Sequence, residues 1–428
     1  MRKFVESRFF ITLTVALYLA LAGVLFYIMS TRTKPEIEFV LAKLVPEVLF
    51  AGFLLIAIGV ILCRCDITAA FSGLFALAYP HPHHLRQGEK ELHPTEGDDG
   101  ERDQVQNTAE THCSAAWKGE VQWALPFRLG RLILPGVWLL AIFIVGLLLV
   151  SQVAPQTHRI YYDEDIYANM GQNIAHTAQT GMANFATFEY GEYFIHWLLY
   201  NKDPGGWPFL ISLAFRLFGT DETFAFYLNN LLFAGGILIV FFITRLLAGG
   251  RLSGLLPAMI YTLIPHNLIW SNTIAAEVPA AFFGGLTVLC TLVWLRTRKM
   301  RHLFLFMIVL PFACYMRPES ALIALWALAA VAMNLFSIPS PHPGSHPTLF
   351  RHPLATRSFW AMRLIAFALI IPHIWHLYAV SGQSWGADGA KFATSFFTKN
   401  LAVNGPYFLN NKEFPILFTL LAFVGLAA

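Results

Sequence analysis

Apolar runs of about 20 residues recur along the chain, and polar segments separate them. A helix rises about 1.5 Å per residue, so a run of this length can span the hydrocarbon core of a bilayer. The segment 303–316 is shorter and contains Pro311, which makes its limits less distinct. The pattern predicts an all-α polytopic membrane protein with about ten spans: 9–29, 45–62, 132–151, 224–246, 252–270, 278–296, 303–316, 319–336, 359–380 and 414–428.

The composition supports the same fold class. Hydrophobic residues make up 56% of the 428 residues and charged residues only 13%, whereas soluble domains carry about 25% charge. A net charge of +3 is too small to indicate a nucleic-acid partner, and the basic residues cluster at helix ends. The five cysteines show no metal-ligand spacing. These features exclude a soluble enzyme and a nucleic-acid-binding protein.

Two long polar segments interrupt the apolar pattern, at 80–130 and 337–357. The first is rich in His, Pro, Gly and charge, and we interpret it as a disordered loop without a packed core. Its His81, His83 and His84 could bind a metal, but a solvated loop is the favoured interpretation. The sequence therefore divides into an N-terminal accessory region with two spans (1–79), a polar cytoplasmic insert (80–130) and a main transmembrane domain (131–428).

The distribution of Lys and Arg predicts the orientation. The strongest positive clusters are the N-terminal segment MRKFVESR and the loop RTRKMR at 296–301, and both should be cytoplasmic. Three spans then deliver residues 152–206 to the extracytoplasmic side. The apolar segment 206–219 is too short to span, so we expect a juxtamembrane or re-entrant helix there. The protein should therefore lie in the cytoplasmic (inner) membrane.

The predicted outer loop begins with YYDEDIYANMGQNI at 161–174, which holds three consecutive carboxylates, Asp163, Glu164 and Asp165. A solvated loop or a helix cap would explain acids at this place. The loop is also about 55 residues long and dense in aromatic residues, and long ordered loops are often functional. It contains Lys202 as well. A carboxylate that accepts a proton, beside cations that hold a phosphate, suits group transfer.

A series of short motifs follows the chain in a fixed order. D-E-x-x-Y occurs at Asp163, Glu164 and Tyr167, and Lys-x-Pro at Lys202 and Pro204. Next come RLFG, TDETFAFYLNN, IPHNLIWSNTIAAEVPA and CYMRPES. Over residues 132–336 this series resembles the GT-C membrane glycosyltransferases of the protein O-mannosyltransferase and lipid A aminoarabinose transferase group. The resemblance implies a GT-C-like bundle with a long extracytoplasmic first loop that contains juxtamembrane helices.

The resemblance also implies a reaction and its participants. A polyprenyl-phosphate-linked sugar would be the donor, and a hydroxyl of a glycan, lipid or protein would be the acceptor, with inversion at the anomeric carbon. Asp163 matches the position of the general base, and Glu164 would orient the acceptor or act as a second acid. Asp165 departs from the family's pattern and receives no role.

Five further residues are expected to bind substrate. Lys202 matches the family's lysine, and Arg317 is a second cation for the leaving phosphate. An alternative for Arg317 is a local pair with Glu319, and for Glu277 a helix cap. Tyr167, Glu277 and Glu319 complete the expected site. No obligatory metal or cofactor is expected, although the D-x-D of Asp163 and Asp165 could hold a divalent cation.

Two other function classes remain open at this stage. A transporter or flippase would also carry broken helices and charges within the membrane, but its ionisable residues should lie near mid-bilayer. A receptor or scaffold could use the aromatic loop to bind a partner, but this would not explain carboxylates and cations on one leaflet. The enzyme interpretation accounts for more of the sequence.

Overall fold

The computed structural model describes residues 2–75, 135–159, 161–250, 252–336, 357–383, 394–409 and 416–427. The predicted polar insert 80–130, with its three histidines, lies outside these residues. So does the predicted loop 337–357, apart from its last residue.

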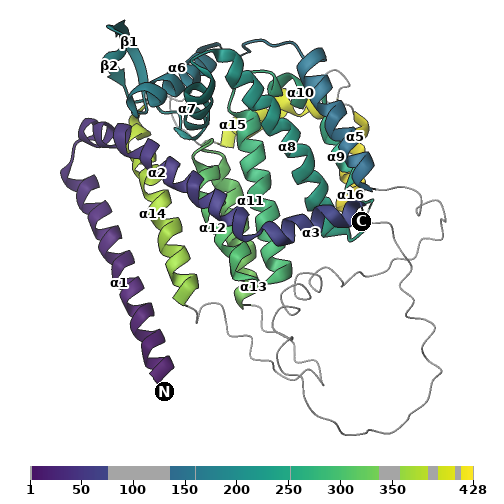
Figure 1. Ribbon diagram of the computed structural model, residues 1–428, viewed down its shortest axis with the longest axis horizontal. Coiled ribbons are helices and arrows are strands. Elements are labelled where there is room, and N and C mark those ends of the chain that lie inside the picture. The colour runs from purple at the N-terminus through teal and green to yellow at the C-terminus, as the bar shows by residue number, and fades with distance from the viewer. Residues whose placement is uncertain are drawn as a thin grey trace, which may run out of the picture.

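The described chain forms a bundle of apolar helices (Figure 1). Among the described residues, five helical segments are long and apolar enough to cross a membrane: Lys34–Leu62, Pro135–Val153, Glu222–Ala248, Glu277–Thr297 and Phe359–Gly382. The predicted polytopic, mainly α-helical fold class is confirmed. These segments and three further apolar helices form the bundle. In chain order they are α1 (Arg2–Thr31), α2 (Lys34–Leu62), α5 (Pro135–Leu148, continued by the π-helix η2, Leu149–Val153), α8 (Glu222–Ala248), α11 (Glu277–Thr297), α12 (Met300–Cys314), α13 (Ser320–Phe336) and α14 (Arg357–Ala379).

The described chain also contains the helices α3 (Arg64–Phe75), α15 (Thr394–Asn404) and α16 (Ile416–Ala427) and the short 3₁₀-helices η4 (Val380–Gly382) and η5 (Pro406–Leu409). Helices α8, α11, α12 and α14 pack in sequence against one another, and α2 crosses against α12 and α14. The first three helices therefore pack into the bundle, α1 on α14 and α3 on α5.

The predicted single span at 252–270 is wrong. Two short helices occupy this segment, α9 (Leu255–Leu263) and α10 (Pro265–Ser271). Helix α9 ends at Ile264, whose extended backbone precedes Pro265, because a proline disfavours the helical conformation of the residue before it. Together the two helices still bring the chain back to the end of the bundle where α8 begins. There Asn272 Nδ2 donates to the carbonyl of Ala154, directly after η2, at 2.8 Å.

The long loop between η2 and α8 is more structured than the sequence indicated. It contains α6 (Tyr161–Thr177), the antiparallel strands β1 (Met182–Glu189) and β2 (Glu192–Leu199), and α7 (Gly206–Phe218). The helix expected at 206–219 is present, but the β-hairpin was not predicted. Its turn residues Tyr190 and Gly191 both have positive φ, as a tight two-residue hairpin loop requires. Figure 1 shows the hairpin projecting from the bundle beside α6.

The two ends of the bundle differ in charge. We call the end that carries α6 and the beginnings of α8, α11 and α13 the acid end, since Asp163, Glu277 and Glu319 lie there. The opposite end, here the basic end, holds the RTRKMR loop between α11 and α12. There Asp66 accepts hydrogen bonds from Lys299 Nζ at 2.8 Å and Arg301 Nε at 2.7 Å.

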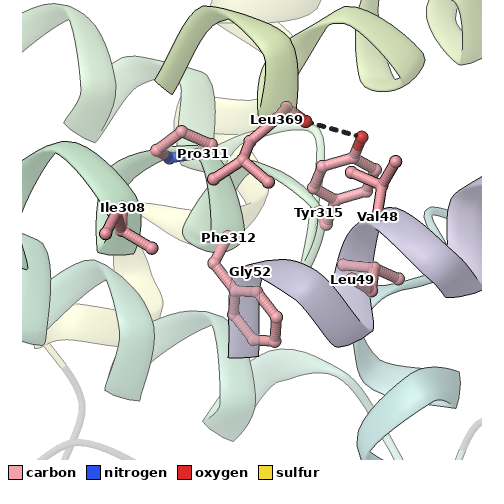
Figure 2. A pocket seen from close by; sticks show the side chains of 8 residues that line it. All are labelled: Val48, Leu49, Gly52, Ile308, Pro311, Phe312, Tyr315 and Leu369. Carbon is pink, nitrogen blue, oxygen red and sulfur yellow. Dashed lines mark hydrogen bonds between the residues drawn. The ribbon is translucent and has the colours of Figure 1, made fainter. Parts of the chain in front are cut away.

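A close backbone contact holds α7 against the end of α12. Gly206 N donates to the carbonyl of Tyr315 at 2.9 Å, and a Cβ on Gly206 would lie 2.5 Å from that oxygen, so a side chain has no room. The Tyr315 hydroxyl donates to the carbonyl of Leu369 in α14 at 2.9 Å (Figure 2). This tyrosine lines a small apolar cavity of about 10 Å³, the size of one water, among α2, α12 and α14. The segment that follows Tyr315 is therefore firmly placed.

The orientation can be tested with two variants that each keep one cysteine. One retains Cys65, which is exposed at the basic end, and the other carries Tyr190→Cys at the fully exposed hairpin tip. A membrane-impermeant maleimide should label position 190 in intact cells and Cys65 only after permeabilisation. The reverse pattern would invert the predicted topology.

Candidate active site

The acidic triplet lies in the first turns of α6, and its three members have different surroundings. Glu164 is completely buried. One of its oxygens accepts from the backbone N–H of Arg159 at 2.7 Å, and the other from the backbone N–H of Ile274 at 2.8 Å. His158 Nδ1 lies 3.3 Å from the second oxygen. Both oxygens are thus engaged with the protein, which makes Glu164 an anchor for the backbone.

The backbone that Glu164 holds is the loop 272–276, immediately before Glu277. Trp207 in α7, which is fully buried, donates from Nε1 to the carbonyl of Ile274 at 2.7 Å. Asn229 in α8 donates to the carbonyl of Thr273 at 2.8 Å. Side chains of α6, α7 and α8 therefore converge on one loop, which we call the anchor loop. It fixes where α11, and with it Glu277, begins.

Asp163 and Tyr167 lie one helical turn apart and so share a face of α6. Tyr167 is 7% exposed, and the charges of Asp203, Arg317, Asp163 and Glu277 all act on it. Burial, aided by these carboxylates, raises the pKa of Tyr167 well above its usual value. The structure thus gathers predicted residues from α6, α11 and the start of α13 around one buried hydroxyl.

Arg317 and Lys202 provide the positive charge of the site. Arg317 forms ion pairs with Glu277 and with Glu319, the latter at 3.2 Å from Nε. Burial opposes the charge on its guanidinium, but the two glutamates outweigh this effect and raise the pKa of Arg317. Lys202 Nζ lies 3.9 Å from Asp203. The alternative predicted for Arg317, a pair with Glu319, is therefore also present.

Two residues of this region were missed by sequence reasoning. Asp203 is 7% exposed, and its Oδ2 has no hydrogen-bond partner among the described residues. Burial and the charge of Asp163 raise the pKa of Asp203, against the influence of Lys202. His376 in α14 has Nε2 3.0 Å from the carbonyl of Lys202, so it positions the lysine backbone. The sequence shows an aspartate between Lys202 and Pro204, but it does not predict that this side chain is buried.

A groove of about 350 Å³ opens beside Arg317, between α11 and α13. Its polar end is formed by Arg317 with Glu277 and Glu319, and its apolar wall by Ala280, Ala281 and Ile323. A polar end joined to an apolar wall suits an amphiphile with a polar headgroup.

The geometry of α6 does not favour the predicted alternative in which Asp163 and Asp165 together bind a metal ion. Residues two apart on a helix do not face each other, and Asp163 is half-buried while Asp165 is exposed. Within the described ranges, no group of three or more His, Cys, Asp or Glu side chains gathers as a metal site would. Asp163 and Asp165 therefore point in different directions from α6.

In a comparison with protein families, residues 202–345 match the model of the dolichyl-phosphate-mannose-protein mannosyltransferases. The resemblance to the GT-C membrane glycosyltransferases is confirmed. The mannosyltransferase-like segment, as we call residues 202–345, contains Lys202, Glu277, Arg317 and Glu319, and it begins after the acids of α6.

Two further comparisons add little. No curated protein matches the chain. Among solved structures, the chain is similar to an oligosaccharyltransferase from Archaeoglobus fulgidus, crystallised with a tethered acceptor peptide, at 14% identity and a TM-score of 0.33. The similarity covers 64% of this chain and 38% of that one, so the chain spans little more than a third of its length. A likeness this distant does not place individual residues.

The anchor role of Glu164 predicts a loss of stability in Glu164→Gln. The amide directs an N–H group at a backbone donor, which leaves buried polar groups without partners at a cost of about 1–3 kcal/mol. The thermal midpoint in detergent should therefore fall.

Asp163→Asn is the matched control, because it makes the same chemical change one residue away at a half-buried position. Its midpoint should stay near that of the unchanged protein. Equal midpoints for both variants would contradict the anchor role.

Proposed function

We propose that the protein transfers a sugar from a polyprenyl-phosphate-linked donor to an acceptor hydroxyl at the outer leaflet of the cytoplasmic membrane. The observation that carries this proposal is the cluster at the acid end. The charges of Asp163 and Arg317 both act on the buried Tyr167 there, and Arg317 also lines a groove with an apolar wall. The family match supports glycosyl transfer, and the position of the basic loop at the opposite end supports the orientation.

The groove between α11 and α13 is the proposed donor site. The lipid phosphate would lie against Arg317, and the first part of the polyprenyl chain would follow Ala280, Ala281 and Ile323. Glu277 and Glu319 hold the guanidinium in place, and the raised pKa of Arg317 keeps it charged. A preorganised cation stabilises the negative charge that gathers on the leaving phosphate.

Asp163 is the proposed general base. A hydroxyl is a weak nucleophile at neutral pH, so a carboxylate must take its proton as the new bond forms. The acceptor oxygen bonds to the anomeric carbon while the bond from that carbon to the phosphate oxygen breaks. The electron pair of the broken bond leaves with the lipid phosphate, and the configuration inverts.

Tyr167 and Asp203 would hold the reacting groups. The raised pKa of Tyr167 keeps its hydroxyl protonated at neutral pH, so it can donate a hydrogen bond to the sugar or the phosphate. Asp203 is buried beside Lys202 with one free oxygen, which suits a hydrogen bond from a sugar hydroxyl. Lys202 would be the second cation at the phosphate.

Asp163→Asn should abolish transfer and leave folding and donor binding nearly unchanged. The amide keeps the size of the side chain but cannot accept a proton, and the loss of a general base costs about 10²–10⁴ in rate. The assay follows sugar release from polyprenyl-phosphate sugars extracted from the native membranes, with synthetic polyprenyl-phosphate mannose as the first defined donor.

Asp165→Asn is the matched control, because Asp165 lies on the same helix and is exposed. It should keep nearly full activity, and a chelator should have no effect. Full activity in Asp163→Asn would exclude the proposed base, and equal losses for both variants with sensitivity to chelator would indicate a metal site.

Arg317→Ala and Lys202→Ala should each weaken productive use of the donor. One lost electrostatic contact is worth about 2–4 kcal/mol of transition-state stabilisation. The kcat/KM for donor should fall accordingly in each variant. Lys43→Ala removes an exposed lysine from the first half of α2 and should leave kcat/KM unchanged. Wild-type kinetics in both site variants would remove the phosphate contacts from the mechanism.

A further inference from the structure

A second large cavity lies toward the basic end, away from the proposed active site. It has a volume of about 350 Å³ and is half open. Helices α2, α3, α8, α11 and α12 all contribute to its wall. The lining is almost entirely apolar, with Phe71, Leu238, Phe242, Leu286, Leu289 and Leu305 among its residues.

The length of the cavity matches one leaflet of a bilayer. Its wall on α8 runs from Gly235 to Leu246, and its wall on α11 from Phe282 to Val293. Eleven helical steps measure about 16 Å, which is close to half of a hydrocarbon core about 30 Å thick. An acyl chain from a single leaflet would therefore fit along it.

The polar end of the cavity is formed by Asp66 and His302. Asp66 holds Lys299 and Arg301, whose side chains are 27% and 33% exposed. His302 Nε2 also lies 2.8 Å from Asp66. Two cations thus face one carboxylate, which leaves the cluster with a surplus of positive charge. Arg64, exposed at the beginning of α3, adds to it.

Helix α3 runs crosswise to α8 (Figure 1), as a helix that lies along a membrane surface would, and Asp66 and Phe71 on it line the cavity. The cavity is apolar along the depth of one leaflet and has cations at one end. This pattern is complementary to an anionic lipid, which has apolar chains and a negative headgroup.

We propose that this cavity binds an anionic phospholipid of the cytoplasmic leaflet, with an acyl chain among α3, α8 and α11 and its phosphate at Lys299 and Arg301. The lipid would join α3 and the RTRKMR loop to the bundle. This site is separate from glycosyl transfer at the acid end, and it stands whether or not that function does.

Native mass spectrometry of the detergent-purified protein tests the proposal. Phosphatidylglycerol should bind at least about tenfold more tightly than phosphatidylcholine of the same chains, a difference of about 1.4 kcal/mol. Ala70→Trp places a bulky side chain at a residue that lines the cavity and should lower phosphatidylglycerol binding about tenfold or more. Ala69→Trp, at the neighbouring residue that does not line the cavity, should bind as the unchanged protein does.

A second pair of variants tests the headgroup without filling the cavity. Lys299→Gln leaves Asp66 with Arg301 and His302, and it should reduce the preference for phosphatidylglycerol. Arg363→Gln removes one charge from a side chain that lies over the rings of Phe359 and Trp360 in α14, which do not line the cavity, and it should keep the preference. Inorganic phosphate should not compete, because it lacks the acyl chain.

Four outcomes of these binding experiments would overturn the proposal. They are equal binding of the two lipids, unchanged binding in Ala70→Trp, equal losses in both glutamine variants, and a polyprenyl phosphate that binds more tightly than phosphatidylglycerol and loses this binding in Ala70→Trp. Absence of any lipid bound at the cavity, with a segment of the chain cross-linking to Leu238→Cys instead, would assign the cavity to the protein itself.

Discussion

The buried carboxylate of Glu164 is the constraint on which the acid end depends. A carboxylate removed from water is costly unless hydrogen bonds or opposite charges compensate for the lost hydration. Here two backbone N–H groups do so, one from Arg159 before α6 and one from Ile274 in the anchor loop. Glu164 and Ile274 are 110 residues apart in the chain, so one side chain joins two distant parts of the fold.

The anchor loop carries this constraint to the rest of the site. Trp207 and Asn229 also bind its carbonyls, so α6, α7 and α8 all meet there. Since α11 begins directly after the loop, the same contacts set Glu277, which in turn orients Arg317. The hydrogen bond from Gly206 N to the carbonyl of Tyr315 fixes the backbone two residues before Arg317. The proposed proton acceptor and the proposed phosphate-binding cation are thus placed by one connected set of contacts, which suits catalysis by positioning.

The separation of charge along the bundle gives the two ends different chemistry. At the acid end, Glu277 and Glu319 pair with Arg317, and the charges of Asp163 and Asp203 act on the buried Tyr167. At the basic end, a single carboxylate organises Lys299, Arg301 and His302. This arrangement differs from that of a transporter, whose ionisable residues line a path through the middle of the membrane. It is compatible with an enzyme that works at one surface and meets anionic lipids at both.

The sequence alone determined the fold class, because an apolar run has few options in lipid other than a helix that satisfies its own backbone. It also predicted a site with Asp163, Tyr167, Lys202 and Arg317, whose residue types and order resemble a known family. The hairpin was missed because its aromatic residues suit a membrane interface as well as a strand, and the break at Pro265 because hydropathy averages over it.

The different environments of the three acids were decided only by the tertiary structure. Asp163, Glu164 and Asp165 are equivalent in composition, yet one faces Tyr167, one is enclosed by backbone donors and one is exposed. The helix turns successive side chains about 100° apart, so neighbours must point in different directions. What each direction meets depends on α7, α8 and the anchor loop, which are distant in the chain. Asp203 and His376 became visible for the same reason, since burial and contact are properties of packed helices and not of the residues that compose them.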